Sequence, residues 1–307
     1  MRNDGIEYRI YTDTKAAYAD VQGDNLDLMA GVPASAMKTF MADKRVTGYN
    51  KPGSSIMFIT IPERLEHFGL NEEGNLRRRA ISMAIDRGSI CKKIFNGTRT
   101  PAVDFIAPSI PGYTDSLKGR DAMKYAPAEA KKLWNQANAI SPWTGKLRLT
   151  YAADLAGYKE SSEAIVNTLK NDLGVDTETT IIPTFNELAT EMDGRKTDSP
   201  YMMGWSADYP AADDYLVQLY DSSTADGKGA NYGDYKNPDF DALMDKALAS
   251  SDADEAARYY QQGEELLAKD LPNIPLWYMN ATAVSVPGLK NVKFGYDNTP
   301  MLDQISK

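Results

Sequence analysis

Histidine and cysteine are nearly absent from this sequence of 307 residues, which contains one of each, His67 and Cys91. A lone cysteine cannot form an intrachain disulfide, and one histidine with one cysteine cannot supply a zinc site of the usual four-ligand kind. We expect Cys91 to be a buried thiol that packs as a small hydrophobe. We do not expect the fold to bring the two residues together as a catalytic dyad.

Long hydrophobic runs are absent as well. No stretch approaches the ~20 apolar residues of a membrane-spanning helix, and no signal peptide opens the chain. Residues 1–5, Met-Arg-Asn-Asp-Gly, lead directly into a strand-like segment. We therefore expect an expressed fragment whose targeting information was removed.

The sequence lacks the short motifs of common enzyme classes. It has no nucleophile elbow, no P-loop, no zinc-protease motif and no Rossmann glycine fingerprint. The scarcity of histidine removes the commonest general base. The net charge of -9 repels phosphate backbones, so a nucleic-acid partner is not expected. We expect no cofactor and no metal site.

Alternating strand-like and helical patterns predict an α/β protein with segregated units and no internal repeat. The expected strands cover residues 7–11, 26–29, 56–61, 147–151, 175–182, 201–205 and 274–279. The expected helices cover 14–22, a segment from Pro33 to Met41, a segment from Asn75 to about Arg87, one closed by Asn96-Gly97, one from Pro127, one ending at Leu173, 184–192, one from Pro238 and 252–269. Between them, residues 98–125 are predicted to form a long ordered loop.

The two ends of the chain are expected to pair with each other. The strands predicted at 7–11 and 26–29 lack enough partners of their own, and the sequence becomes strand-like again at 292–294.

The most informative segment is 203–210, Met-Gly-Trp-Ser-Ala-Asp-Tyr-Pro. A strand delivers Trp205 and then Asp208 into a loop at its C-terminal end, where α/β folds place ligand sites. Trp205 offers a flat apolar wall, and Asp208 offers a carboxylate that can pair with an ammonium group. The alternative is a core tryptophan and an aspartate that caps a helix beginning near Ala211. The residues alone favour neither.

Two charged runs have simpler interpretations. We expect Arg77–Arg79 to spread around a helix and stay solvated rather than to bind an anion. We expect Asp213 and Asp214 to favour the start of a helix through its dipole rather than to bind a metal. Asp208 paired with either of them would suit a glycosidase-like hydrolase, which is a further alternative.

Six segments in the same order resemble the oligopeptide- and dipeptide-binding proteins, the large solute-binding receptors of ABC importers (solute-binding protein family 5). The strongest is residues 75–87, Asn-Leu-Arg-Arg-Arg-Ala-Ile-Ser-Met-Ala-Ile-Asp-Arg. The others lie at 11–27, at 204–209, around Asn231-Tyr232 with 237–241, at 264–270 and at 272–278. The resemblance covers nearly the whole chain.

The resemblance implies a periplasmic-binding-protein-like fold of the large three-domain class (type II). Residues 1–72 would then be part of domain I, residues 73–283 would be domain III, and residues 284–307 would return to domain I. Domain II and the N-terminal part of domain I would be absent.

The resemblance also implies a function. The chain would belong to an extracytoplasmic, non-enzymatic receptor that hands short peptides to the permease subunits of an ABC importer. It would be a monomer, in the periplasm or anchored by lipid at the outer face of the cell membrane. Asp208 would pair with the α-ammonium of the peptide and Trp205 would be the wall, with Ser206 and Tyr209 completing the ligand-binding set.

The resemblance leaves the ligand's other end and its class open. Some relatives carry an arginine for the peptide's carboxylate three residues before the tryptophan, where this chain has Met202. Relatives that bind oligosaccharides, nickel complexes or haem are the alternative within the same fold.

Overall fold

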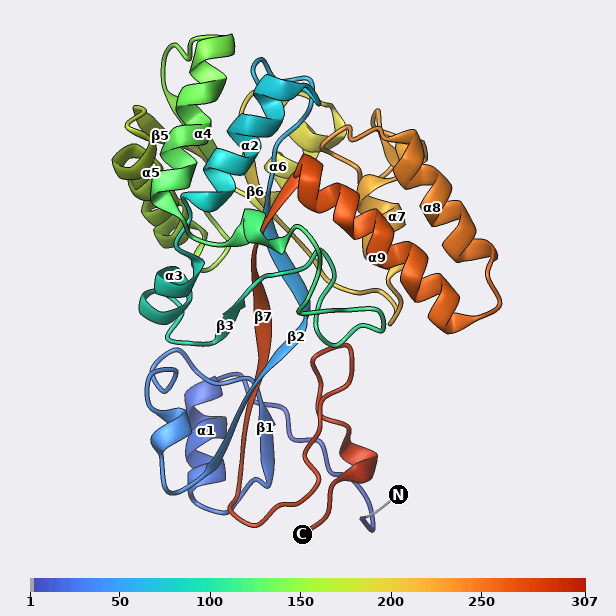
Figure 1. Cartoon of the computed structure of the whole chain (residues 1–307). Coiled ribbons are helices and arrows are strands. Elements are labelled where there is room, and N and C mark those ends of the chain that lie inside the picture. The colour runs from blue at the N-terminus through green and yellow to red at the C-terminus, as the bar shows by residue number, and fades with distance from the viewer. Residues whose placement is uncertain (1–2) are drawn as a thin grey trace.

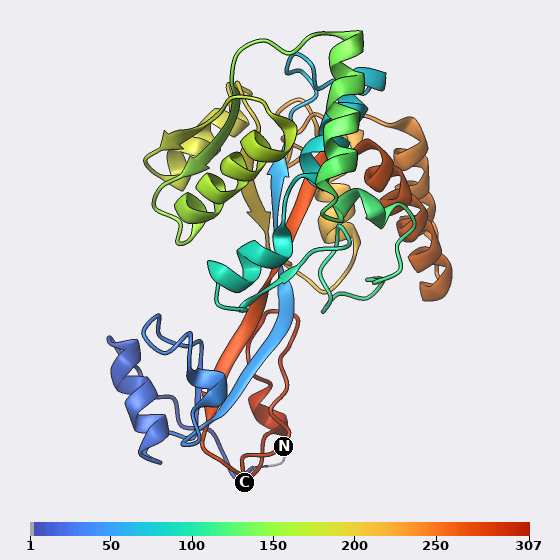
Figure 2. The same ribbon diagram turned by 60° about the vertical axis from the view of Figure 1, so that its left-hand side comes forward.

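Two lobes joined by a pair of long antiparallel strands make up the molecule (Figures 1 and 2). The computed structural model describes residues 3–307, so Met1 and Arg2, where the expected fragment begins, lie outside the described residues. The joining strands are β2 (Thr47–Thr60) and β7 (Asn273–Ser285). Their cross-strand register runs from Thr47 opposite Ser285 to Thr60 opposite Asn273, with irregularities at Pro52/Ser55 and Met57/Phe58.

The lower lobe of Figure 1 contains both ends of the chain. Its elements are α1 (Thr14–Gln22), β1 (Leu28–Ala30), the 3₁₀ turn η1 (Phe40–Ala42) and the C-terminal segment with η4 (Leu302–Gln304). Strand β1 pairs with the end of β7. The side chain of Asn3 donates to the carbonyls of Leu302, at 2.8 Å, and Ile305, at 3.0 Å. The ends of the chain therefore meet, but not by the predicted strand pairing, because Phe294 forms only an isolated bridge with Pro300.

Two of the predicted elements of the lower lobe are wrong. Residues 7–11 form no strand, and Ile6, Tyr8 and Ile10 are 45%, 79% and 96% exposed. Their alternation satisfies a strand pattern, but no strand within residues 3–307 pairs with them. The helix predicted from Pro33 is a series of turns that ends in η1. Most of its bonds join residues three apart, such as Ala36 N to Pro33 O at 2.9 Å. This tighter turn buries Ala36 and Phe40 but leaves Met41, on the same face of the predicted helix, 58% exposed.

The upper lobe follows the predicted alternation of helices and strands, and the helix Asp213–Tyr220, which the sequence indicated only through its acidic start and within the alternative for Asp208, is added to it. Its helices are α2 (Glu72–Met83), α3 (Arg87–Lys93), α4 (Pro127–Ile140), α5 (Tyr158–Leu173), α6 (Phe185–Asp193), α7 (Asp213–Tyr220), α8 (Pro238–Ala249) and α9 (Ala253–Asp270). Its strands are β3 (Arg99–Pro101), β4 (Leu147–Ala152), β5 (Thr177–Ile182) and β6 (Tyr201–Trp205), and its 3₁₀ turns are η2 (Arg120–Met123) and η3 (Ser222–Thr224). The helix predicted from Asn75 to Arg87 is interrupted, because α2 ends at Met83 and α3 begins at Arg87. The predicted loop over 98–125 holds only β3 and η2.

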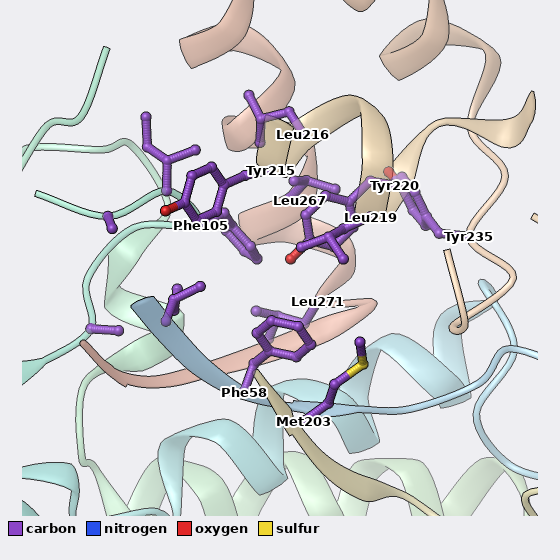
Figure 3. Close-up of a cluster of buried hydrophobic side chains, with 14 of the residues drawn as sticks. Phe58, Phe105, Met203, Tyr215, Leu216, Leu219, Tyr220, Tyr235, Leu267 and Leu271 are labelled. Carbon is purple, nitrogen blue, oxygen red and sulfur yellow. The ribbon is translucent and has the colours of Figure 1, made fainter. Parts of the chain in front are cut away.

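One seven-stranded sheet runs through both lobes in the order β1-β7-β2-β6-β4-β5, with β3 paired to β7. Its upper part is covered on both faces. One face packs against α7, α8 and α9 through a cluster that includes Phe58, Met203 and Tyr215 (Figure 3). The opposite face packs against α2 to α5 through a cluster that includes Met57 and Met202. Alternate residues of β2 and β6 thus belong to different cores.

Two of the three arginines of α2 are buried, so the prediction of a solvated run is wrong for Arg77 and Arg78. Arg77 and Arg78 are both 0% exposed. The guanidinium of Arg77 lies over the rings of Trp134, at 4.7 Å, and Trp143, at 5.1 Å. Arg78 donates to the carbonyls of Phe68, Leu271 and Pro272. These carbonyls belong to irregular segments, where a guanidinium replaces the missing backbone donors.

The cysteine and the histidine occupy structural positions. Cys91 is buried, as predicted, and burial raises the pKa of its thiol to about 12. His67 Nδ1 lies 2.6 Å from Glu73 Oε1. None of the helices within residues 3–307 combines the length and hydropathy that crossing a bilayer requires.

Candidate functional site

Strand β6 carries the candidate site and has one largely open edge. It pairs along its full length with β2, from Ile56 opposite Trp205 to Thr60 opposite Tyr201. On its other edge it pairs with β4 only where Tyr201 meets Thr150. Among residues 3–307, no strand pairs with residues 202–205 on that second edge. An unpaired edge of this kind presents backbone N–H and C=O groups to a ligand.

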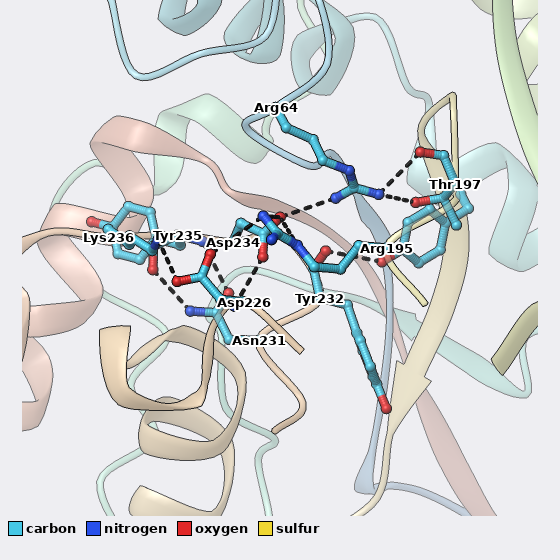
Figure 4. Close-up of polar contacts among 10 residues, drawn as sticks. Arg64, Arg195, Thr197, Asp226, Asn231, Tyr232, Asp234, Tyr235 and Lys236 are labelled. Carbon is cyan, nitrogen blue, oxygen red and sulfur yellow. Dashed lines mark hydrogen bonds and ion pairs between the residues drawn. The ribbon is translucent and has the colours of Figure 1, made fainter. Parts of the chain in front are cut away.

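A polar network fixes the start of β6 (Figure 4). Arg64, just beyond β2, donates to the carbonyl and hydroxyl oxygens of Thr197, at 3.0 and 2.6 Å. It also donates to Asp234 Oδ2 at 3.1 Å, which Arg195 reaches at 2.9 Å. Asp234 is 6% exposed, so the shared carboxylate is largely removed from water, whereas the side chain of Arg195 is 40% exposed. It ties the segments before β6 and before α8 to the end of β2.

A buried carboxylate holds the loop that follows β6. Asp214, 1% exposed in the first turn of α7, accepts from Trp205 Nε1 at 3.2 Å and from the backbone N–H of Asp208 at 3.0 Å. Burial raises the pKa of Asp214, and these two hydrogen bonds oppose the rise. Asp213 accepts from Tyr209 Oη at 2.6 Å. The expected place of both acids at a helix start is confirmed.

The structure brings the four predicted site residues into this one loop. Trp205 is half-buried and packs against the core of Figure 3, while Ser206, Asp208 and Tyr209 are exposed. The Ser206 hydroxyl lies 2.8 Å from the hydroxyl of Ser55 on β2. The carboxylate of Asp208 has no hydrogen bond or ion pair with any residue in the range 3–307.

The alternative in which Asp208 caps a helix is wrong. The N-cap of α7 is Ala212, and no side chain caps it. The alternative for Trp205 holds in part, because one side of the indole packs on the core. Sequence reasoning missed the role of Asp214 as the acceptor that orients both Trp205 and Asp208. The only available signal was an acid six residues after Asp208.

The two best-formed cavities lie away from Trp205 and Asp208. One, of about 280 Å³, lies between β2, β7 and the C-terminal segment and is lined by residues that include Tyr49, Lys51 and Phe294. The other, of about 170 Å³, is lined by residues that include His67 and Trp143. The described part of the chain contains no cluster of three or more His, Cys, Asp or Glu side chains suited to a metal ion.

Comparison with protein families identifies the chain. Residues 2–227 match the family described as "Bacterial extracellular solute-binding proteins, family 5 Middle". The chain belongs to this family. The resemblance inferred from the six sequence segments is thereby confirmed.

Curated relatives in family 5 differ in their named ligands. The chain is 24% identical over 300 residues to Heme-binding protein A of Haemophilus influenzae, covering 96% of this chain and 52% of the relative. It is 31% identical over 240 residues to the periplasmic oligopeptide-binding protein OppA of Salmonella typhimurium, covering 74% and 40%. The chain thus spans about half the length of the curated relatives it matches.

Solved structures confirm the predicted fold class. HbpA2 from Haemophilus parasuis superposes with a TM-score of 0.83 at 17% identity, over 97% of this chain and 57% of that one. The periplasmic binding protein DppA from Helicobacter pylori, in complex with the peptide STSA, superposes with a TM-score of 0.74 at 21% identity, over 97% and 56%. The α/β architecture of this chain is that of the periplasmic binding proteins of family 5.

Proposed function

We propose that this chain is the larger, C-terminal part of an extracytoplasmic solute-binding subunit of an ABC importer, and that the subunit captures short peptides. Membership of family 5 supports the binding role. Relatives named for oligopeptide and dipeptide binding support the ligand class. The subunit would be a monomer that presents its ligand to permease subunits, in the periplasm or anchored by lipid at the outer face of the membrane.

The unpaired, exposed carboxylate of Asp208 carries this proposal. Its backbone is held by Asp214, so the charge is displayed at a fixed place while its oxygens stay available. An α-ammonium group would form a charge-assisted hydrogen bond there. Trp205 would provide the wall, and Ser206 and Tyr209 the adjoining polar surface. The open edge of β6 supports main-chain pairing with an extended peptide, the mode in which backbone bonds supply affinity.

Position 202 cannot serve the peptide's carboxylate. Met202 is 0% exposed and lies in the core beneath α2 to α5. The resemblance implies an arginine for the carboxylate at this position in some relatives. In this chain the carboxylate must be bound elsewhere or left to water.

The domain assignment is part of the proposal. We assign residues 1–72 and 284–307 to domain I and residues 73–283 to domain III. The passage of the chain between lobes through β2 and β7 supports a division into these two parts, and Ile61 and Phe68, before the boundary at residue 72, pack in a core of the upper lobe. The exposed apolar side chains of Ile6, Tyr8 and Ile10 are typical of a surface that another part of the protein covers. Since domain II would form the opposite side of the binding cleft, this chain alone should bind peptides weakly or not at all.

Other readings predict different ligands or a reaction. A receptor for haem or a metal complex is favoured by the haem-binding relative and by the fold of NikZ from Campylobacter jejuni, solved with Ni(L-His). A hydrolase would use Asp208 with a second acid. Of the two candidates for that acid, Asp214 is buried and accepts from Trp205 and from the Asp208 backbone, and Asp213 accepts from Tyr209 Oη. These contacts support a binding role over catalysis.

Replacing Asp208 by asparagine tests the proposal. The measurement is calorimetric binding of matched free-amine and N-acetylated peptides to the chain joined to the segments that its longer relatives have. We expect Asp208→Asn to lower the affinity for free-amine peptides roughly tenfold or more, which corresponds to the loss of a hydrogen bond to a charged group. The affinity for acetylated peptides should not change. Asp245→Asn, an exposed aspartate on α8, is the matched control and should change neither.

The other outcomes separate the alternatives. If the protein bound haem or a sugar, and Asp208→Asn did not change that binding, the alternative receptor for haem or an oligosaccharide would be favoured. Turnover that the substitution abolishes would establish a hydrolase. Tight peptide binding by residues 1–307 alone would refute the proposal that domain II is needed to complete the binding cleft.

A further inference from the structure

Arg99 is an incompletely satisfied cation beside the candidate site. It lies on β3 and is partly buried, and burial lowers the pKa of its guanidinium. The guanidinium makes one hydrogen bond to a residue in the range 3–307, from Nη1 to the carbonyl of Thr98, at 2.8 Å. Within that range, no carboxylate lies at ion-pair distance from it. A guanidinium has five N–H donors, so most of them are left without a protein partner.

The other buried arginines show what full satisfaction looks like in this protein. Arg78 donates to three backbone carbonyls. Arg87, 3% exposed, donates to the carbonyls of Pro275, Ser82 and Met123 and to the hydroxyl of Ser82. Both cations are thus dispersed over the protein's own acceptors. Arg99 has been removed from water in part without that compensation, which is unfavourable unless an anion completes it.

The sheet places Arg99 in the same cross-strand row as the candidate site. Arg99 pairs with Met279 on β7, Met279 pairs with Ser55 on β2, and the hydroxyl of Ser55 lies 2.8 Å from that of Ser206. Directly opposed residues point to the same face of a sheet. Three strand spacings of ~4.8 Å separate the backbones of Arg99 and Ser206 by roughly 14 Å, and the arginine side chain covers part of that span.

The groups around the guanidinium connect it to the strand that carries the candidate site. The guanidinium lies 5.2 Å from the ring of Phe95, and it is near enough to Tyr158 and Cys91 to influence their titration. Tyr158 Oη donates to the sulfur of Met57. This sulfur lies against Gly204 of β6, so closely that a Cβ added to the glycine would be 2.6 Å from it. The neighbourhood of Arg99 therefore reaches β6 at Gly204 through Tyr158 and Met57.

A helix N-terminus reinforces the positive potential. Tyr158 is the first residue of α5, a helix of 16 residues whose N-cap, Gly157, has no side chain to satisfy the free N–H groups. Such a helix end favours negative charge. Glu160 is an acid in the same first turn, and no ion pair joins it to Arg99 among residues 3–307.

We infer that Arg99 receives the terminal carboxylate of the bound peptide and so takes the place of the arginine that Met202 excludes. This inference rests on the proposed function. Asp208, after β6, and Arg99, on β3, then bind opposite ends of one zwitterionic ligand, on opposite sides of the central pair β2 and β7. The pair selects for a free amine at one end and a free acid at the other.

The experiment compares alanine peptides that end in a free acid with the same peptides ending in an amide. Binding is measured by calorimetry at the length that binds most tightly, with the chain joined to the segments of its longer relatives. We expect the acid to bind wild-type protein roughly tenfold or more tightly than the amide. Arg99→Gln should reduce that ratio to about one by weakening the acid alone. Arg99→Lys should keep part of it, since lysine retains the charge but not the planar fork.

Two controls make the result decisive. Lys92→Gln removes an exposed positive charge from nearby α3 and should leave the acid-to-amide ratio unchanged. Inorganic phosphate, added as a competitor, should weaken the binding of the peptide acid but not that of the peptide amide.

The outcomes separate this inference from the proposed function. Equal loss of acid and amide in Arg99→Gln, or no loss of either, overturns the role of Arg99 while leaving peptide binding intact. A complete absence of peptide binding in the wild-type protein overturns the proposed function. Because the readout is a ratio within each variant, a modest loss of stability in Arg99→Gln does not affect it.

Discussion

Replacing Glu63 by glutamine should remove a pH-dependent loss of stability from the upper lobe. Glu63 follows β2 and is partly buried, and its Oε1 has no hydrogen-bond partner among residues 3–307. Burial raises the pKa of its carboxyl from 4.5 to about 7, although Arg78 nearby favours the charged form. The folded protein therefore holds this proton more tightly than the unfolded chain does.

The sign and size follow from linkage between protonation and folding. Because the folded pKa is the higher one, the stability contribution is fully present below about pH 4.5 and is lost as the pH rises through 7. A rise from 4.5 to about 7 corresponds to about 3 kcal/mol once the group is ionised in both states. Glutamine cannot ionise, so Glu63→Gln should gain about 2–3 kcal/mol relative to wild type between pH 5 and pH 8.

Urea unfolding followed by tryptophan fluorescence measures this difference where it arises. The chain has four tryptophans, namely Trp134, Trp143, Trp205 and Trp277, and all lie in the upper lobe with Glu63. The matched control is Glu163→Gln, an exposed position on α5. It should alter stability by less than about 0.5 kcal/mol at either pH.

One result would refute the reasoning. If the difference in unfolding free energy between Glu63→Gln and wild type were the same at pH 5 and pH 8, the carboxyl would not be held neutral by burial.

Two further predictions concern buried groups of the upper lobe. Cys91, whose pKa burial raises to about 12, should not react with a thiol reagent at pH 8 until urea unfolds the protein; rapid modification of the folded protein would contradict its burial. Arg78→Met should lower the free energy of unfolding by about 3 kcal/mol or more, because three buried carbonyls lose their donors. Urea denaturation measures this loss, and a change below about 1 kcal/mol would show that water replaces the guanidinium.

The sequence predicted the upper lobe well because its elements carry local signals. Thr184 caps α6, Asn237 caps α8 and Asp252 caps α9, each through its side chain. Gly174 ends α5 in the left-handed conformation. Caps and apolar periodicity depend on neighbours in the sequence, so they survive whatever the rest of the chain does.

The lower lobe was predicted less well because its structure depends on partners distant in the sequence. The alternation of residues 7–11 is real, but a strand needs a second strand beside it. The lower half of β2, residues 47–52, lacks the apolar run that marked residues 56–61, since it is covered less completely. Its strand structure comes from pairing with β7.

Charge patterns misled for a related reason. Three consecutive arginines suggest a solvated helix surface, but Arg77 and Arg78 face Trp134, Trp143 and the carbonyls near β7. Those partners lie 56 or more residues away in sequence from the arginines that they contact. The unpaired state of Arg99, like the burial of Asp214, is a property of the folded surroundings and has no counterpart in local sequence.

The pairing of Lys51 with Ala281 has a consequence for protein engineering. These residues are cross-strand neighbours on β2 and β7, and they precede and follow the segments of both strands that pack in the upper-lobe cores. Residues 52–280 therefore form a continuous insertion whose ends adjoin, a geometry that tolerates excision and circular permutation. We expect the upper lobe, with its two central strands and its ligand-facing loop, to be transferable as one unit onto another pair of antiparallel strands.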